Sequence, residues 1–469
     1  MKVKVLHLDP SQYAVKRPGD RVPIVRNPGI SSTSTPNHRQ REYMRALNAA
    51  KLDRMFAKPF VAALDGHSDS VEALARSRSL LAPIFSGSAD GSINFWDLPG
   101  KRRVVSIPKA HKSFVRGLVM SNDNRVLYSV GADSQLRAWK FDPDTFVRSS
   151  ESLGEDEPEE ALQNEEQGLM AKSIDWSSGF TGVDHHWAKR SEIATSSGQT
   201  VDIWDIFMSN SPIQSYQWGE ETVLSCRYNP SEVSLLAATM SDNSVGLFDV
   251  RASSGIQKVF LKNRSNAVSW NPRDPFIFAL ANDDGNIYQM DMRKIGVKSP
   301  IVKMHTGHVQ GVVDVEFSPI GTELVSGGYD KTVRIFDLFS QRSREIYHTK
   351  RMQRVLSVKF TGDGRFVLSG SEDANIRVWK AVANEKLGSI DKRETRAIEY
   401  RNKLKDKFEN VEEIGKILHN RRVPKWIKNE GKRRADHFES RKIAHRNKVI
   451  AGKEKEVHAL EKPVSKIEQ

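Results

Sequence analysis

The sequence predicts an all-β protein: a seven-bladed β-propeller with a basic extension before it and a basic, α-helical extension after it. Three observations predict this architecture. A short motif recurs through the middle of the 469-residue chain, mostly at intervals of 42–46 residues. Each copy alternates apolar and polar residues, as a half-buried strand requires. Positive charge is concentrated at the two ends of the chain.

The repeat is clearest in three segments: SGSADGSINFWDL (86–98), SGGYDKTVRIFDL (326–338) and SGSEDANIRVWKA (369–381). The copies close at Trp96-Asp97, Trp139-Lys140, Trp204-Asp205, Phe248-Asp249, Met290-Asp291, Phe336-Asp337 and Trp379-Lys380. A period near 43 resembles that of WD repeats, in which each repeat forms one four-stranded blade. Seven copies therefore predict a seven-bladed WD40-type ring over residues 60–380.

Residues 1–59 carry a net charge of +8 and form the predicted N-terminal extension, whereas residues 60–380 carry −4. Within 41–60, apolar residues recur at helical spacing and predict a short amphipathic helix lying against the ring or a partner. Its basic residues are candidates for partner contact: Arg41, Arg45, Lys51, Arg54 and Lys58.

The segment FVAALDGH (60–67) contains an apolar strand before the first repeat. In WD rings such a strand completes the last blade, so ring closure should join residues 60–64 to residues 354–380. Both extensions would then leave the ring from the same blade.

Polar residues within three blades resemble the His–Ser/Thr–Asp–Trp network that stiffens WD blades. The candidates are His67, Asp90 and Trp96 in blade 1, His111, Asp133 and Trp139 in blade 2, and His308 and Asp330 in blade 6. Phe336 replaces the tryptophan in blade 6, and blades 3, 4, 5 and 7 lack the histidine.

The longest interval contains ESLGEDEPEEALQNEE (151–166), with eight acidic residues and no basic one. It lies between the third and fourth strands of blade 2 and is expected to be a disordered loop on the outer rim. It is either a solubilising insertion or a docking segment for a basic partner.

Residues 381–469 carry a net charge of +9. A stripe from Tyr400 to Leu418 predicts one helix from Asp391, Pro424 ends it, and Trp426 to about Val449 can form another. The apolar residues of this second helix are too few to bury a full face. It is therefore either solvated and partly disordered, or ordered by a polyanion or an acidic protein surface. The candidate contacts, with Trp426 as a stacking or packing anchor, are Arg421, Arg422, Lys425, Lys428, Lys432, Arg433, Arg434, Arg441 and Lys442.

The sequence lacks the phosphate-binding GK[ST] loop, HExxH and GxSxG motifs, so we predict no enzymatic activity, cofactor or small-molecule substrate. His185-His186, Asp283-Asp284 and Glu220-Glu221 are interpreted as structural residues, since no partner completes a metal or catalytic site. The single cysteine, Cys226, is expected to be a buried thiol in a reducing compartment. No run of residues is apolar and long enough to span a membrane.

The extensions resemble a specific family, the Sof-type WD-repeat proteins (the WD repeat and SOF domain-containing family). The resemblance rests on MKVKVL, REYMRALNAAKLDRMFAKPF, TKRMQRVLSVKF, NIRVWKAVANEKLG and the run from Tyr400 through HNRRVPKWI to the basic end. It implies a nucleolar, non-enzymatic assembly factor of the small-subunit processome. Such a factor supports pre-rRNA processing and 18S rRNA maturation, with the U3 snoRNP, pre-rRNA or U3 RNA, and ribosomal proteins as partners.

A second hypothesis rests on Phe248-Asp249-Val250-Arg251, which resembles the [WF]-D-x-R ending of WD proteins that act as substrate receptors of cullin ubiquitin ligases. Asp249 and Arg251 would contact the ligase adaptor. Met290-Asp291-Met292-Arg293 keeps the Asp and Arg but not the aromatic residue. A chance occurrence of so short a pattern is the alternative.

Overall fold

The computed structural model describes residues 38–143, 170–207, 210–252, 254–295, 300–421, 423–450 and 466–468. The chain divides into two compact units. The propeller unit comprises residues 59–383 and 421–469, and the helical unit comprises residues 1–58 and 384–420. The acidic segment 151–166 lies outside the described residues.

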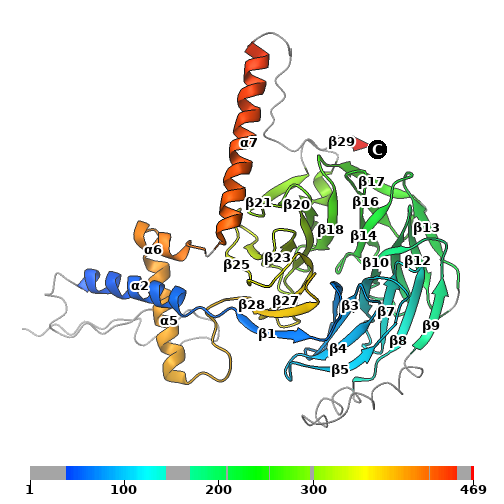
Figure 1. Cartoon of the computed structure of the whole chain (residues 1–469), viewed down its shortest axis with the longest axis horizontal. Coiled ribbons are helices and arrows are strands. Elements are labelled where there is room, and N and C mark those ends of the chain that lie inside the picture. Colours follow the sequence, from blue (N-terminus) through cyan, green and yellow to red (C-terminus); the bar gives the residue numbers. More distant parts are fainter. Residues whose placement is uncertain are drawn as a thin grey trace, which may run out of the picture. The chain divides into compact units, whose positions relative to one another are not determined.

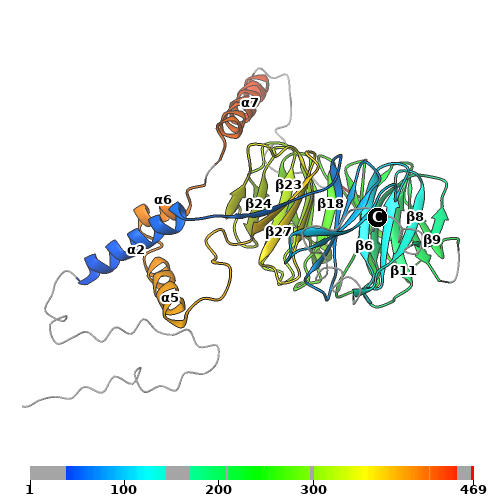
Figure 2. The same ribbon diagram turned by 60° about the horizontal axis from the view of Figure 1, so that its bottom comes forward.

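Seven antiparallel sheets are arranged as the blades of a ring, which confirms the predicted fold (Figures 1 and 2). From blade 1 to blade 7 the first strands are β2 (Val71–Arg76), β6 (Val115–Met120), β10 (Phe180–His185), β14 (Val223–Tyr228), β18 (Ser265–Trp270), β22 (Val312–Phe317) and β26 (Val355–Phe360). The second strands are β3 (Pro83–Ser88), β7 (Val126–Gly131), β11 (Glu192–Ser197), β15 (Leu235–Met240), β19 (Ile277–Asn282), β23 (Glu323–Gly328) and β27 (Phe366–Ser371).

The third strands are β4 (Ile93–Asp97), β8 (Gln135–Lys140), β12 (Thr200–Asp205), β16 (Ser244–Asp249), β20 (Asn286–Asp291), β24 (Val333–Asp337) and β28 (Asn375–Lys380). The fourth strands are β5 (Arg102–Ile107), β9 (Met170–Asp175), β13 (Gln214–Gln217), β17 (Gly255–Phe260), β21 (Ile301–Thr306), β25 (Glu345–Tyr347) and, in blade 7, β1 (Phe60–Asp65). A short 3-10 helix, η2 (Met292–Lys294), follows β20, and β29 (Lys466–Glu468) pairs with the outer edge of β17.

The hydrophobic core lies between neighbouring blades, because each sheet buries both of its faces against the next. Phe85 and Phe95 of blade 1 pack edge-on at 5.0 Å between ring centroids. Phe141, which follows the third strand of blade 2, packs against Phe85 at 5.2 Å. Every residue of β3 is buried. A blade therefore cannot bury its apolar residues without both of its neighbours.

The ring closes through β1, which pairs antiparallel with β28 from Phe60↔Trp379 to Asp65↔Asn375. The N–H of Lys380 also donates to the carbonyl of Pro59 at 2.8 Å. Blade 7 thus contains one strand from before blade 1 and three strands from the end of the repeat region, as the sequence predicts.

The polar networks differ from blade to blade. Blade 2 has the complete set: His111 Nδ1 lies 3.0 Å from Asp133 and Nε2 lies 2.7 Å from Ser129 Oγ, to which Trp139 also donates at 2.8 Å. Burial lowers the pKa of His111, so its imidazole is neutral at physiological pH. This network ties the turn of the blade to its central strands.

In blade 6, His308 bonds Asp330 at 3.0 Å and Ser326 at 2.7 Å, with Phe336 in the tryptophan position. Blade 1 is arranged differently from the predicted network. His67 contacts Ser92 (2.9 Å) and Ser86 (2.6 Å), whereas Asp90 accepts hydrogen bonds from Ser68 and Ser92.

Blades 3 and 7 lack the histidine but keep the tryptophan contact. Trp204 Nε1 donates to Thr195 at 2.8 Å, and Trp379 Nε1 donates to Ser369 at 2.8 Å. In blade 3 the missing turn aspartate is replaced by Asp202 on the third strand, which is fully buried and accepts from Ser197 and Thr200. Different side chains thus satisfy the same buried polar positions.

The helical unit contains α2 (His38–Met55), α5 (Lys392–Lys407) and α6 (Glu412–Leu418). Its core is formed by Ala46, Leu47 and Ala50 of α2 with Leu404, Phe408 and Ile414. Lys407 Nζ also bonds the carboxylate of Glu42 at 2.8 Å, and Lys405 pairs with Asp53. The segments on either side of the propeller therefore fold together.

Two details of the helical prediction are wrong. The apolar face predicted within 41–60 is only partly confirmed. Leu47 lies in the core and Tyr43 packs against it, whereas Met44, Leu52, Met55 and Phe56 are exposed, and Ala46 and Ala50 complete the contact face. Alanine lets helices approach closely, so small residues form the contact face. The helix predicted from 391 to 418 breaks at 408–411, where Phe408 leaves helical geometry. The helix predicted after Pro424 is α7 (Lys425–Ile450).

Replacing Leu64 with alanine tests ring closure. Leu64 of β1 is 1% exposed and packs in one cluster with Ile84, Trp96 and Leu368 of blades 1 and 7. The cavity left by Leu64→Ala should lower the free energy of unfolding by about 2–4 kcal/mol. Urea denaturation of the full chain measures this change, and Asp65→Ala, at an exposed position of the same strand, is the matched control. Equal stability of the two variants would contradict closure through β1.

His67 should make the ring less stable in mild acid. Burial lowers its pKa from 6.5 to about 4, so the unfolded chain binds a proton that the folded ring does not. The free energy of unfolding should therefore decrease as the pH falls from about 6.5 to about 4. In His67→Gln this contribution is absent, and the urea midpoint should fall less over the same pH range.

Exposed His437→Gln is the control for this measurement and should keep the pH dependence of the wild type. If His67→Gln lost as much stability on acidification as the wild type, His67 would not contribute to the acid sensitivity.

Candidate protein-interaction faces

The strand directions define two faces of the propeller. The first and third strands of a blade run in the same direction, so the loops that follow them open on one face. We call this the AB face, after the loops that join first to second and third to fourth strands. The opposite face, the BC face, carries the loops between second and third strands and those between blades.

Asp249 and Arg251 lie on the AB face, directly after β16. The N–H of Arg251 donates to the Asp249 carboxylate at 2.9 Å, and Tyr216 Oη donates to the Asp249 carbonyl at 2.9 Å. These bonds fix the turn. The Arg251 side chain is exposed, and its guanidinium makes no hydrogen bond or ion pair with the described residues. It can therefore bond a partner without first breaking a contact.

Asp291 and Arg293 form the corresponding turn of blade 5, but their side chains bond each other. Arg293 Nε and Nη2 each lie 3.1 Å from the Asp291 carboxylate, and the guanidinium stacks 4.3 Å from the Phe276 ring. Burial alone would raise the pKa of Asp291, but the hydrogen bonds from Arg293 lower it. Of the two Asp-x-Arg turns, only the first has its arginine free.

Large apolar side chains are exposed around the same face, in loops that follow first or third strands. They are Leu81, Trp187, Phe207, Ile213, Ile320 and Phe339. Phe339 is the extreme case, at 88% exposed. Exposed aromatic residues on the same face as a free arginine are typical of protein-binding surfaces.

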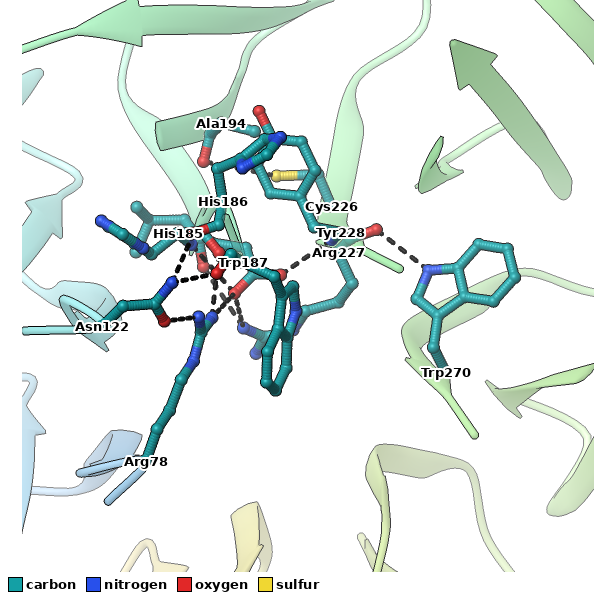
Figure 3. A network of polar contacts seen from close by, with 12 residues as sticks. Arg78, Asn122, His185, His186, Trp187, Ala194, Cys226, Arg227, Tyr228 and Trp270 are labelled. Carbon is teal, nitrogen blue, oxygen red and sulfur yellow. Dashed lines mark hydrogen bonds and ion pairs between the residues drawn. The ribbon is translucent and has the colours of Figure 1, made fainter. Parts of the chain in front are cut away.

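Trp187 is held on the AB face by a polar network across blades 1, 2 and 3 (Figure 3). The Arg78 guanidinium lies 3.8 Å from the Trp187 ring centroid and donates to the His185 carbonyl at 2.9 Å and to the Asn122 side chain. Asn122 Nδ2 donates in turn to the His186 carbonyl at 3.1 Å. Burial lowers the pKa of Arg78 to about 10, so the side chain stays charged at neutral pH.

A second part of the network joins blades 3, 4 and 5 at the mouth of the central channel (Figure 3). The Asp184 carboxylate accepts from the N–H of Tyr228 at 2.8 Å and lies 3.7 Å from Arg227 Nη1. Trp270 Nε1 donates to the Arg227 carbonyl at 3.0 Å. A cavity of about 470 Å³ opens here, but these charged groups are already engaged in joining the blades.

The helix α7 lies on the BC face of the same unit. Arg434 Nη1 donates to the carbonyl of Val309 at 2.7 Å, and Nη2 donates to the carbonyl of Asp284. Ile427 is 3% exposed, whereas Trp426 beside it is 42% exposed. Trp426 and Pro424 line a cavity of about 390 Å³ together with five residues of blade 6 and the loop to blade 7: Lys331, His348, Thr349, Lys350 and Met352.

The predicted contact residues of the C-terminal extension are not equivalent. Exposed side chains on α7 are Lys425, Lys428, Lys432, Arg433, Arg441 and Lys442. Arg433 pairs with Glu430 at 3.6 Å. Arg421 is partly buried, Arg434 anchors the helix to the ring, and Arg422 lies outside the described residues.

The predicted residues of the N-terminal extension belong to the helical unit. Arg41, Arg45 and Lys51 are exposed on α2, and Lys58 is exposed beyond its end. Arg54 instead donates to the carbonyl of Leu418 and helps to join α2 to α6.

The residues interpreted as structural have structural contacts. His185 Nε2 lies 3.0 Å from the Arg190 carbonyl, and His186 Nδ1 accepts from the N–H of Lys189 at 2.9 Å. Burial raises the pKa of Cys226 to about 12. The part of the chain that the structure describes holds no group of three His, Cys, Asp or Glu residues suited to a metal ion. No described helix is long and apolar enough to cross a membrane.

Sequence reasoning missed the Arg78–Trp187 stack and the cavity beside Trp426. Lys331 and Trp426 are 95 positions apart, and no local pattern joins them. The exposed phenylalanines of the AB face carry a weak signal, since Phe207 and Phe339 each stand two positions after a blade-closing dipeptide.

Two family models match the chain. Residues 381–465 match the Sof1-like domain, and residues 58–97, 102–140, 299–337 and 343–380 match the WD domain, G-beta repeat. The WD matches fall on blades 1, 2, 6 and 7. Among solved structures, the crystal structure of the WD40 beta propeller domain of Doa1 has a TM-score of 0.54 at 16% identity, covering 69% of this chain and 96% of that chain. That likeness shows the fold alone.

Several curated relatives match nearly the whole chain, each named DDB1- and CUL4-associated factor 13. The Xenopus laevis protein is 40% identical over 98% of this chain and 99% of its own length. The Danio rerio protein is 39% identical over 95% and 94%, and the Homo sapiens protein is 39% identical over 91% and 90%.

These names overturn the main functional prediction from the sequence, a small-subunit processome factor that works with the U3 snoRNP and pre-rRNA. They refer to DDB1 and CUL4, and thereby favour the alternative hypothesis of a cullin-ligase receptor. The error lies in the function that we inferred from the resemblance, whereas the resemblance itself is confirmed. With a WD-repeat propeller, a Sof1-like domain and relatives at about 40% identity over 98% of its length, the chain belongs to the family of Sof-type WD-repeat proteins.

Proposed function

We propose that this protein is a substrate receptor of a cullin ubiquitin ligase and that it docks on the ligase adaptor through the AB face of its propeller. The observation that carries the proposal is the set of near full-length relatives named DDB1- and CUL4-associated factor 13. A receptor of this kind performs no chemistry itself. It binds the adaptor on one surface and the protein to be modified on another.

The geometry of the first Asp-x-Arg turn supports the AB face as the adaptor site. Asp249 holds the backbone of the turn, and Arg251 presents five N–H donors that the described residues leave unused. The turn fixes the backbone of Arg251 before a partner arrives, so only the arginine side chain has to be ordered on binding.

The apolar rim supports the same face. A stable protein interface buries roughly 800 Å² per partner, with a few aromatic or arginine residues supplying most of the binding energy. Phe207 is 67% exposed and Phe339 is 88% exposed on loops of this face. Together with Arg251 they supply the residue types that dominate such interfaces.

DDB1 appears in the relatives' name, and we take it as the ligase adaptor. Arg251→Ala should weaken binding of purified DDB1 by at least about tenfold. The guanidinium supplies bonds to the partner that alanine cannot, while the backbone of the turn is unaffected. Surface plasmon resonance with the full-length chain measures the affinity.

Arg293→Ala is the matched control, because the same residue type in the same position of blade 5 already bonds Asp291. Its effect on adaptor affinity should be small. Retention of full adaptor affinity by Arg251→Ala would refute the proposed docking mode, and failure of the wild-type chain to bind the adaptor would refute the function.

A further inference from the structure

We propose that the groove between α7 and blades 6 and 7 on the BC face binds an acidic protein segment that carries one aromatic or large apolar anchor residue. This inference rests on the proposed receptor function and names the class of protein that the receptor captures. We call the cavity lined by Trp426, Pro424, Met352, Lys331, Lys350, His348 and Thr349 the α7 groove.

The α7 groove combines two apolar residues of low exposure, Met352 and Pro424, with one exposed aromatic residue. Met352 is 2% exposed and Pro424 is partly buried, whereas Trp426 is 42% exposed. A volume of about 390 Å³ accommodates one large side chain with part of its backbone. Trp426 lines this cavity without filling it. Tryptophan is among the residue types most enriched in binding hot spots.

The position of the tryptophan is set by the helix. Ile427, the next residue, is buried, and Arg434 two turns later bonds the carbonyls of Val309 and Asp284. An added Cβ at Gly431 would lie 3.9 Å from Val309 Cγ2, so the helix runs close to the loop there. The first three turns of α7 are thus held on the ring, and the groove exists before a partner arrives.

Cations surround the groove on both sides. Lys331 and Lys350 line it, and exposed Arg351 and Arg354 follow on the same loop. On α7, Lys425, Lys428 and Lys432 are exposed within the first two turns. Arg354 and Arg433 have acidic neighbours, Glu372 and Glu430. The remaining positive charge favours carboxylates on the partner and sets its orientation.

The arrangement favours a peptide over a nucleic acid. Single-stranded nucleic acids are held by successive aromatic side chains on which neighbouring bases stack. The next aromatic residue on α7 is Phe438, 12 positions beyond Trp426 and therefore about 18 Å along the helix. One aromatic anchor in a partly apolar cavity suits a single side chain of a protein ligand.

The groove also lies on the face opposite Arg251. The loops at Asp284, Val309 and Lys331 open on the BC face, whereas the turn at Asp249 opens on the AB face. The receptor can therefore hold adaptor and substrate at the same time.

Fluorescence anisotropy of the full-length chain with a labelled probe peptide tests the inference. The probe is a seven-residue peptide with a central phenylalanine flanked on each side by three glutamates. Trp426→Ala should weaken its binding at least about tenfold, Trp426→Phe should restore most of it, and a peptide with alanine at the centre should bind at least about tenfold more weakly. Circular dichroism checks that each variant is folded.

The charge contribution has a matched control. Lys331→Glu/Lys350→Glu should weaken probe binding at least about tenfold, whereas Arg441→Glu/Arg446→Glu, with the same change in net charge further along α7, should change it less than about twofold. Equal effects of the two double variants would show that the probe is attracted by the overall positive charge and is not bound in the groove. Tighter, Trp426-dependent binding of an oligouridylate of equal charge would overturn the peptide assignment.

The two proposals fail separately. Arg251→Ala should lose the adaptor and keep the probe, and Trp426→Ala should keep the adaptor and lose the probe. If adaptor binding depends on Arg251 but probe binding does not depend on Trp426, only the groove is refuted. If probe binding depends on Trp426 but adaptor binding does not depend on Arg251, only the docking face is refuted.

Discussion

Closure of the ring by β1 is the constraint on which the rest of the structure depends. Each blade buries its apolar residues against two neighbours, so an open arc would leave two sheet faces exposed to water. The pairing of Phe60–Asp65 with Asn375–Lys380 removes both open faces at once. It also brings the chain into and out of the ring at one blade, so the segments that flank the repeats start from neighbouring strands. The helical unit contains parts of both segments.

Polar side chains of the inner strands reinforce this closure from blade to blade. The Asp184 carboxylate accepts from the N–H of Tyr228 at 2.8 Å, and that of Asp314 accepts from the N–H of Val358 at 2.9 Å. Burial raises the pKa of Asp314. Charged groups of the channel are thus engaged with the ring itself, and the residues that are free for partners lie on its two faces. Arg251 and Trp426 are the clearest cases, on opposite faces.

The propeller could be predicted from the sequence because its repeat is local: each turn aspartate and closing aromatic residue lies within one blade. The blades with degenerate motifs keep their polar contacts through other residues, as Asp202 does in blade 3. The packing of α2 could not be fully predicted. Met55 and Phe56 are the more hydrophobic residues, but Ala46 and Ala50 form the contact face because their small side chains let the helices approach closely. The α7 groove joins Lys331 to Trp426, a pairing that only the folded chain makes. The processome function was inferred from family resemblance alone, and the residues themselves never specified the particle.

The origin of blade 7 also bears on how the protein is made. During translation β1 leaves the ribosome long before β28 exists, because about 310 residues separate them. At roughly 5–20 residues per second, the incomplete ring persists for about 15–60 s with apolar sheet faces uncovered. Throughout that interval β1 lacks its intramolecular partner and is open to pairing with other chains. Until β28 has been made, the first blade of a nascent chain therefore keeps one apolar sheet face uncovered.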